Sequence, residues 1–294
     1  MITGLTHPGI TTSNLENWLA FIRNNLGACH IQSQVSDQDY LSQVTGLNMA
    51  KLKIGFVKFG VDSFPLEVIE YIHPIGSRQN HQYGCVGYSH IGFVSDEIHA
   101  LRNNCIVNNL EVSEIHHEEH ACWGKYQSFR ITAPDGIPIK IISSKQNAGH
   151  LSPVRVHHTG LTVSDLEAAK QLLEKNLGLV EITRGRQRED ILCNEFDTEY
   201  EFVMLMIPNH DFMIELRKFP FKACGLVDMG HQHPGCLHHC FQVDDIFKDY
   251  ETLKKAGVEF VGQPAQVTAG VNKGAYAIYF HGFDGYRFEI FQKP

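Results

Sequence analysis

Gly235-Cys-Leu-His-His-Cys-Phe-Gln-Val-Asp-Asp245 is the stretch that decides the fold, because three other segments repeat its pattern. Apolar and polar residues alternate as in a strand, and acidic residues follow where a helix would begin. The other copies start at His158, His90 and His7. A repeat of this size sets the architecture, so it comes before any local feature.

Each copy is followed by a short apolar strand that carries one charged side chain. These charged residues are Glu67, Lys140, Glu215 and Glu289. Equivalent positions in the two halves of the chain are almost equally far apart. The offsets are 151 residues for His7 and His158, 148 for Glu67 and Glu215, 148 for His90 and His238, and 149 for Lys140 and Glu289. The near-constant offset predicts a duplicated chain, in which each half consists of two modules.

Each module is predicted to contain a strand, a helix and three further strands. The clearest helix is Ser164–Leu177, with Ser164 or Asp165 as N-cap and Gly178 as its stop. Residues 37–50 and the histidine-rich segment 116–120 are expected to be loops. The polar composition of residues 143–153 is typical of a linker, which puts the domain boundary between residues 145 and 152.

The composition is that of a soluble globular protein. Of 294 residues, 43% are hydrophobic and 20% are charged, and the formal net charge is −8. An acidic chain without a long Lys/Arg cluster argues against a nucleic-acid partner. No apolar run is long enough for a membrane span, and no targeting pattern is present. We therefore expect a cytoplasmic protein with eight reduced cysteines.

The repeated unit, with His on its first strand and Glu on its last, resembles the vicinal oxygen chelate superfamily. Glyoxalase I, methylmalonyl-CoA epimerase, extradiol dioxygenases and the bleomycin and fosfomycin resistance proteins belong to it. Three segments are similar to its signatures and extend the resemblance over nearly the whole chain: Val156-His-His-Thr-Gly-Leu-Thr-Val-Ser-Asp-Leu-Glu167, Asn176-Leu-Gly-Leu179 and Asp284-Gly-Tyr-Arg-Phe-Glu-Ile290.

The resemblance implies an α+β fold in which two βαβββ modules pair into one open, cup-shaped β-barrel. With sequential pairing, the chain has an N-terminal domain at residues 1–145 and a C-terminal domain at residues 152–294. The matched offsets favour this pairing. Some relatives instead pair the first module with the fourth, and that alternative stays open.

The resemblance also implies one divalent metal ion, bound by first-strand and last-strand residues of the two paired modules. In the C-terminal domain the ligands would be His158, Glu215, His238 and Glu289. This donor set suits Fe, Zn, Mn, Co or Ni. The histidine doublets leave His157 and His239 as alternatives, since a one-residue slip turns a strand side chain to the other face.

The N-terminal domain offers His7, Glu67, His90 and Lys140. An ammonium group repels a cation, so this domain is expected to hold no metal, and Glu67 with Lys140 could form a buried ion pair in its place. Under the alternative pairing of modules one and four, the metal site would be His7, Glu67, His238 and Glu289.

A lyase or isomerase of the glyoxalase or epimerase type is the function that these residues favour. An ion with open positions could chelate adjacent oxygens of a small-molecule substrate, and Lewis-acid polarisation would stabilise an enediolate. Glu215 or Glu289, loosened from the metal, could then move a proton between carbons as the catalytic residue.

An Fe(II) extradiol-type dioxygenase is the first alternative, with a triad of His158, His238 and Glu289. Tyr279 lies ten residues before Glu289, where such dioxygenases carry a catalytic Tyr. These enzymes also have a His six to eight residues before that Tyr, and this chain has none at residues 271–273.

A non-catalytic binding or resistance protein is the second alternative. Its cup would hold a ligand without metal, against apolar side chains such as Trp123, Phe241 and Phe291. The sequence leaves a homodimer through an outer sheet edge open.

Overall fold

The structure of the chain is a computed structural model that describes residues 2–60, 63–78, 84–120, 122–144, 154–189, 198–220 and 229–294. The first module consists of β1 (Gly4–Thr12), α1 (Leu15–Leu26), β2 (His30–Ser36), α2 (Tyr40–Thr45), β3 (Lys51–Lys58) and β4 (Leu66–His73). The second consists of β5 (Gly87–Ser95), α3 (Ile98–Val107), β6 (His116–His120), β7 (Gly124–Thr132) and β8 (Pro138–Ser143).

The second half of the chain repeats this order. The third module consists of β9 (Val154–Thr162), α4 (Leu166–Gln171) with a π-helical turn at Leu172–Asn176, β10 (Val180–Glu189), β11 (Thr198–Met206) and β12 (Met213–Lys218). The fourth consists of β13 (Leu237–Gln242), α5 (Ile246–Lys255), β14 (Ala265–Gln266), β15 (Tyr276–His281) and β16 (Arg287–Gln292). The predicted α+β fold of four βαβββ modules is confirmed.

Two segments predicted to be loops are regular structure. Residues 40–45 form α2, and residues 116–120 form β6 at the edge of a sheet, paired with β7. Most of the predicted linker, residues 145–153, lies outside the described part of the chain. Of the described cysteines, Cys85 is disulfide-bonded, contrary to the expectation that all are reduced.

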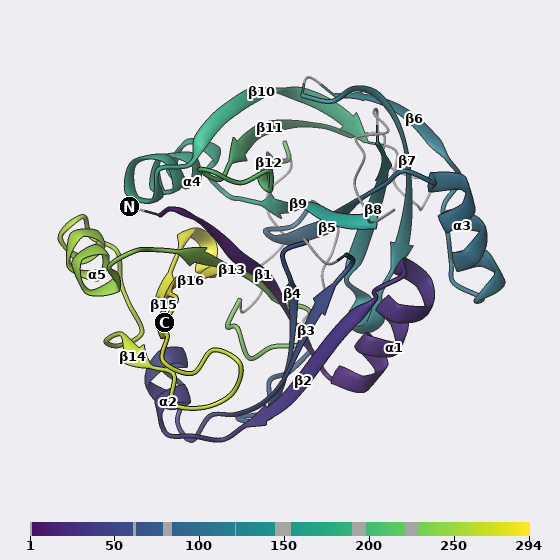
Figure 1. Cartoon of the computed structure of the whole chain (residues 1–294). Coiled ribbons are helices and arrows are strands. Elements are labelled where there is room, and N and C mark those ends of the chain that lie inside the picture. The colour runs from purple at the N-terminus through teal and green to yellow at the C-terminus, as the bar shows by residue number, and fades with distance from the viewer. Residues whose placement is uncertain are drawn as a thin grey trace.

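Eight strands form each of two curled sheets. Sheet A has the order β14-β15-β16-β13-β1-β4-β3-β2, and sheet B has the order β10-β11-β12-β9-β5-β8-β7-β6. In Figure 1 sheet B arches over the top of the molecule and sheet A lies below it. At the middle of each sheet, the histidine strands of two modules pair antiparallel, β1 with β13 and β5 with β9.

The strand order makes sequential pairing of the modules wrong. Sheet A joins the first module to the fourth, and sheet B joins the second to the third. The offsets of the repeat cannot tell the two pairings apart, because both place equivalent strands at equivalent positions. Each sheet contains strands from both halves of the chain, so a division at residues 145–152 does not separate one sheet from the other.

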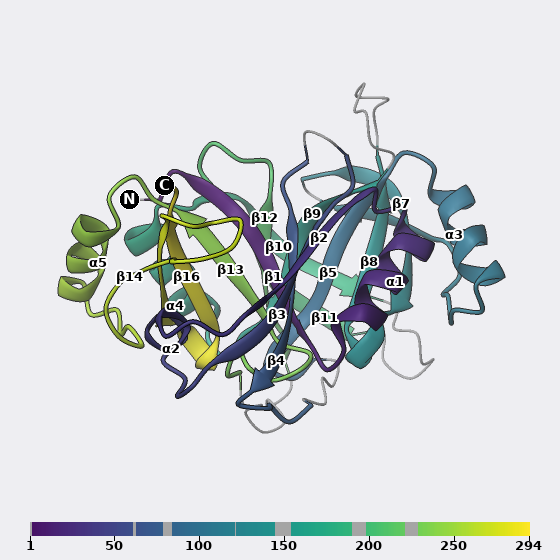
Figure 2. The same cartoon turned by 60° about the horizontal axis from the view of Figure 1, so that its bottom comes forward.

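The convex faces of the two sheets pack back to back, and their concave faces form two cups. One hydrophobic core contains residues of both sheets, including Phe93 of β5 and Phe241 of β13. The Tyr286 hydroxyl crosses between sheets and donates to the Gly87 and Thr162 carbonyls. Figure 2 shows β1 running across the centre of this double layer. We name the concave faces cup A and cup B after their sheets.

In the described part of the chain, four helices pack against strands of the two sheets, and the fifth, α2, lies over one of the cups. In α1, Asn14 is the N-cap, and Gly27 ends the helix with φ of 72°. α1 lies beside α3, and the Asn104 side chain donates to the Asn24 carbonyl. α2 packs against β14 and β15 over cup A. No helix in the described ranges is both long and apolar enough to cross a membrane.

Candidate metal centre

Four side chains of sheet A converge in cup A from four neighbouring strands. The order β16-β13-β1-β4 carries them side by side, and alternation along each strand turns them to the concave face. The register pairs Cα atoms of Gly9 with Glu67 and of Cys240 with Glu289. These four side chains are His7, Glu67, His238 and Glu289.

The donor atoms of the four side chains lie within a few ångströms of one another. Glu67 Oε2 lies 3.2 Å from His7 Nε2 and 3.3 Å from His238 Nε2. Glu289 Oε2 lies 3.9 Å and 3.6 Å from the same two nitrogens. All four side chains are buried. Two imidazoles and two carboxylates thus meet at one point on the floor of the cup.

A glycine on the facing strand makes room for the His238 ring. A Cβ atom on Gly9 would lie 1.9 Å from His238 Cε1, which no packing tolerates. The ring therefore lies flat across the backbone of β1 and points its Nε2 toward the two carboxylates. The doublet is also resolved: the neighbouring His239 faces the opposite sheet, where Nε2 lies 2.7 Å from the Thr159 hydroxyl.

The two carboxylates of cup A have pKa values that move in opposite directions. Burial would raise the pKa of Glu67, but the His7 charge and a hydrogen bond with His238 lower it well below its usual range. Burial raises the pKa of Glu289, and the Glu67 charge adds to this against the lowering effect of His7 and His238. Paired carboxyl groups whose pKa values are driven apart are typical of acid-base sites.

The residues of cup A fit a divalent first-row ion. His7 is 2% exposed, its Nδ1 has no hydrogen-bond partner among the described residues, and its Nε2 lies 3.2 Å from the Glu67 carboxylate. A buried imidazole without such a partner is costly, and coordination of an ion would satisfy it. The nitrogen and carboxylate donors are those that Zn, Fe, Mn, Co and Ni accept.

A cavity of about 70 Å³ adjoins the centre under α2. His7, Glu67 and Glu289 form its polar end. Most of the remaining lining is apolar, and it includes Leu41 of α2 and Phe291 of β16. No Lys or Arg belongs to the lining in the described part of the chain. The cup therefore offers a small, largely apolar chamber with the donors at one end.

Tyr71 and Tyr279 line the same chamber, and His231 packs against both of their rings. The Tyr279 hydroxyl lies 3.2 Å from His238 Nε2, and its ring stacks on His231 at 4.5 Å between centroids. The Tyr71 hydroxyl and both His231 nitrogens are buried with no hydrogen-bond partner among the described residues. Burial lowers the pKa of His231 to about 3, and the nearby His238 adds to this. The ring is therefore neutral at physiological pH.

Cup B carries the equivalent residues of the second and third modules, and they form a different kind of site. His90 Nε2 and His158 Nε2 lie 2.9 Å apart, so the rings bond each other. Glu215 Oε2 lies 2.9 Å from Arg217 Nε, and both side chains are almost fully buried. Lys140 Nζ lies 2.7 Å from Glu118 Oε2. Cations of the chain thus occupy the neighbourhood of each carboxylate in cup B.

The pKa shifts of cup B agree with these pairs. Burial would raise the pKa of Glu118, but the Lys140 charge and three hydrogen bonds lower it to about 2. Burial lowers the pKa of Lys140 to about 8. The Glu118 charge raises this pKa, and the Arg130 and Arg217 charges offset part of that rise. Burial lowers the pKa of both His90 and His158 well below the usual range, with Arg217 and Lys140 among the further causes. His90, His158 and Glu215 place donor atoms within 4.8 Å of one another, and neutral imidazoles can coordinate an ion, but the buried Arg217 and Lys140 charges beside them oppose an added cation.

The structure therefore divides the metal ligands predicted by sequential pairing. His238 and Glu289 lie in cup A, whereas His158 and Glu215 lie in cup B. The predicted ion pair between Glu67 and Lys140 is wrong for the same reason, and Lys140 bonds Glu118 instead. Catalytic candidates Glu289 and Tyr279 lie together in cup A, and Glu215 does not.

Several residues of the two cups had no signal in the repeat. Arg217 and Cys240 occupy inward positions two residues after Glu215 and His238, so the strand period alone could have placed them. Glu118 lay in the segment expected to be a loop. Of the apolar side chains proposed to hold a ligand, Phe291 lines the cavity of cup A, whereas Phe241 belongs to the core between the sheets.

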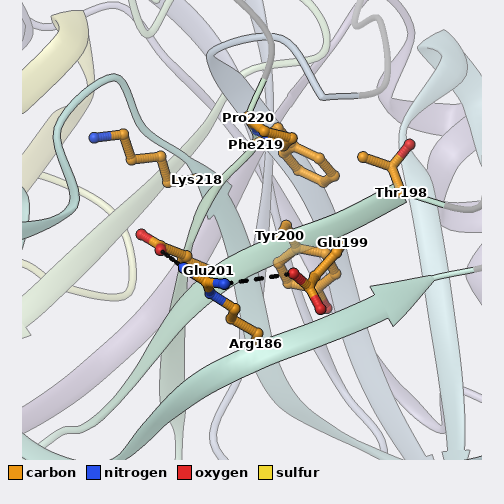
Figure 3. Close-up of a pocket in the computed structure, with 8 residues that line it drawn as sticks. All are labelled: Arg186, Thr198, Glu199, Tyr200, Glu201, Lys218, Phe219 and Pro220. Atoms are coloured by element: carbon orange, nitrogen blue, oxygen red, sulfur yellow. Dashed lines mark hydrogen bonds and ion pairs between the residues drawn. The ribbon is translucent and has the colours of Figure 1, made fainter.

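A larger hollow, of about 400 Å³, lies at the ends of β10, β11 and β12 (Figure 3). Its charged side chains neutralise one another at the surface: Arg186 Nη2 lies 3.0 Å from Glu201 Oε1, and Arg186 Nη1 lies 3.7 Å from Glu199 Oε2. Tyr200 and Phe219 pack together at 5.0 Å between ring centroids. The hollow offers no buried cluster of donors like that of cup A among the described residues.

Residues 155–290 match the family model of the Glyoxalase/Bleomycin resistance protein/Dioxygenase superfamily. This match covers 136 of the 294 residues, and the whole chain has the four-module fold of that superfamily. No curated protein matches the sequence. The superfamily contains enzymes and binding proteins on one scaffold, so membership fixes the fold and leaves the reaction to the site.

Two solved structures illustrate the similarity of the whole chain. Glyoxalase I from Zea mays has a TM-score of 0.68 at 16% identity, covering 98% of this chain and 92% of its own. A Bacillus subtilis subsp. subtilis protein assigned as a dioxygenase has a TM-score of 0.67 at 16% identity, covering 100% of this chain and 86% of its own. At these identities the similarity establishes the fold alone.

Proposed function

We propose that this protein is a divalent-metal-dependent lyase or isomerase that acts on a small molecule with adjacent oxygens. The convergence of His7, Glu67, His238 and Glu289 in cup A is the observation that carries the proposal. Two carboxylates and two imidazoles hold a divalent ion and leave positions for substrate oxygens. When bound, the ion would act as a Lewis acid on those oxygens.

Glu289 is the residue that we assign to proton transfer. It lies farther from both histidines than Glu67 does, and its pKa is raised where that of Glu67 is lowered. A carboxylate with a raised pKa accepts and returns a proton near neutral pH more readily than one held strongly ionised. Glu67 then stays ionised and keeps the two imidazoles oriented, while Glu289 moves a proton between adjacent carbons.

The chamber next to these residues favours a small, uncharged reacting group. A volume of about 70 Å³ accommodates a few non-hydrogen atoms, and the lining in the described residues includes no Lys or Arg. The apolar walls exclude water from the carbon that loses the proton, which strengthens electrostatic interactions there. A compact hydroxyketone or α-dicarbonyl derivative has these properties.

Metal content of matched variants tests the proposal. We expect about one divalent ion per chain by mass spectrometry after reconstitution, lost in His7→Ala and kept in His90→Ala, its counterpart in cup B. A chain that binds no ion, or one that loses it only in His90→Ala, would refute the metal centre in cup A. Exchange of substrate C–H for deuterium in D₂O, followed by NMR, then tests Glu289→Gln, which should bind the ion and lose the exchange.

An Fe(II) ring-cleaving dioxygenase is the second candidate, and the position of Tyr279 is the observation that favours it. Its hydroxyl lies 3.2 Å from His238 Nε2, at the edge of the chamber. Two imidazoles with one carboxylate form the facial triad of such enzymes. Oxygen uptake with a catechol, present in the Fe(II)-loaded protein and absent with other ions, would favour this function over the first.

A further inference from the structure

Cys240 replaces a glycine that the other three modules share. Gly9, Gly92 and Gly160 lie two residues after their histidines, and a Cβ atom on any of them would lie 1.9 to 2.4 Å from a histidine ring of the facing strand. The fourth module has Cys240 at this position, opposite His7 in the register of β1 and β13. His7 therefore faces the Cys240 side chain, whereas the other three histidine rings face the backbone of a glycine.

The Cys240 thiol belongs to the cluster of donors in cup A. It is a free cysteine with 0% exposure, on the same face of β13 as His238 and directly beside Glu289 of β16. Ligand atoms of His7, Cys240 and Glu289 all lie within 4.8 Å of one another. The thiol sulfur is therefore within 4.8 Å of a donor atom of both His7 and Glu289.

The His7 ring supplies an independent reason to place an ion here. His7 is 2% exposed, its Nδ1 has no hydrogen-bond partner among the described residues, and its Nε2 faces the carboxylates of Glu67 and Glu289 at 3.2 and 3.9 Å. His7 is shared by two donor sets, one with Glu67 and His238 and one with Cys240 and Glu289. An ion next to His7 Nε2 is therefore within reach of the sulfur as well as the carboxylates.

We propose that Cys240 is a further ligand of the ion in cup A and biases the centre toward ions that accept sulfur. This proposal rests on the metal centre proposed above. On binding, the thiol loses its proton to solvent and coordinates as a thiolate, as thiols next to divalent ions do. Thiolate is a soft ligand that favours Zn(II), Co(II) and Cd(II) over Mn(II).

A purely structural thiol is the competing explanation. Cys240 forms a side-chain hydrogen bond with Glu289, so it could hold that carboxylate in place without touching the ion. Serine has nearly the same size and donates a hydrogen bond in the same direction, but it is a hard oxygen donor. Cys240→Ser therefore separates the two roles, and Cys240→Gly restores the residue of the other modules.

Absorption spectra of the Co(II)-loaded protein test the proposal. We expect a sulfur-to-cobalt charge-transfer band in the near ultraviolet for the wild type and for Cys29→Ser, a control at an exposed free cysteine. Cys240→Ser and Cys240→Gly should lose the band while they still bind about one Co(II) per chain. The variants should also lose affinity for Cd(II) relative to Mn(II).

Three results would overturn the proposal. Bound Co(II) without the band in the wild type would remove Cys240 from the ligands and leave the metal centre intact. A band that persists in Cys240→Ser would assign the sulfur to another cysteine. No Co(II) bound to the wild type at all would refute the metal centre itself, and Cys240 as a ligand with it.

Discussion

Cup A and cup B are built from the same four positions of the same repeat, yet their buried carboxylates have different partners. In cup A, Glu67 and Glu289 form ion pairs with the imidazoles of His7 and His238. In cup B, Glu215 pairs with Arg217 and Glu118 pairs with Lys140. The comparison indicates that a cation of the chain in cup B can take the electrostatic role that we propose for a metal ion in cup A.

The largest expected effect is on stability, when cup B loses a carboxylate. Glu215→Ala removes the buried partner 2.9 Å from Arg217, and we expect a loss of about 3 to 5 kcal/mol in the free energy of unfolding. In contrast, Glu67→Ala in the presence of a chelator should cost less, since it also relieves the like charge of Glu289. Denaturant titration of both variants measures this difference. Equal losses would mean that the cups are balanced in the same way.

The acid limb of the stability curve tests the second ion pair of cup B. Glu118 has a pKa lowered from 4.5 to about 2, with a side chain that is 18% exposed. Because the folded state holds this carboxylate ionised, its contribution is complete above about pH 4.5 and is lost as the pH falls toward 2. We expect a decline of about 2 to 3 kcal/mol in that window, after allowance for the partial exposure.

The control for the acid limb is Glu118→Gln. It should be less stable than the wild type at pH 7 and should approach it as the pH falls through about 2, where the Glu118 carboxyl of the folded state becomes protonated. Chemical denaturation at several pH values gives the two curves. A constant gap between them at all pH values would contradict the assigned pair.

Matched glycine variants compare the histidine rings of the two cups. In Gly9→Ala the new methyl group would meet the His238 ring at 1.9 Å, and in Gly92→Ala it would meet the His158 ring at 2.0 Å. Overpacking of this kind costs about 1 to 3 kcal/mol, and we expect a similar loss of stability in both variants. Only Gly9→Ala should also lose bound metal, measured by mass spectrometry. Metal loss in Gly92→Ala alone would move the centre to cup B.

The repeat made the modules predictable, because strand alternation and helix caps are local signals. His7, Glu67, His238 and Glu289 could each be found by their place in it, and so could the inward orientation of His238 rather than His239. The same repeat could not tell which modules share a sheet. The sequential and crossed pairings use identical strands with identical offsets, so the offsets hold no information that chooses between them.

The chemistry of cup B was predictable in kind and not in detail. Lys140 at a ligand position indicated an internal cation in the N-terminal half, paired with Glu67, whereas the structure pairs it with Glu118 in cup B, the cup of His158 and Glu215. The partners were missed because Arg217 and Glu118 lie outside the repeated positions. The strand period could have placed Arg217 on the same face as Glu215, whereas Glu118 gave no signal because its segment was expected to be a loop.

The smallest expected effect concerns a difference within cup A. Tyr279 faces Glu289 across β15 and β16, and Phe56 holds the equivalent place opposite Glu67. Tyr279→Phe would make the two sides of the cup alike and would remove the hydroxyl 3.2 Å from His238 Nε2. If this hydroxyl only orients the imidazole, the loss is about 0.5 to 1.5 kcal/mol, which is roughly tenfold or less in turnover.

A larger loss would give Tyr279 a different role. Proton transfer by a positioned side chain contributes about 10² to 10⁴ in rate, so a decrease of that size in kcat with unchanged metal content would make Tyr279 an acid-base residue. Steady-state kinetics of Tyr279→Phe beside Glu289→Gln distinguishes the two outcomes. If Glu289 alone carries the proton, Glu289→Gln loses the reaction and Tyr279→Phe retains most of it. On the other side of the cup, His7 already has a ring without a hydroxyl as its neighbour, that of Phe56, with 6.0 Å between ring centroids.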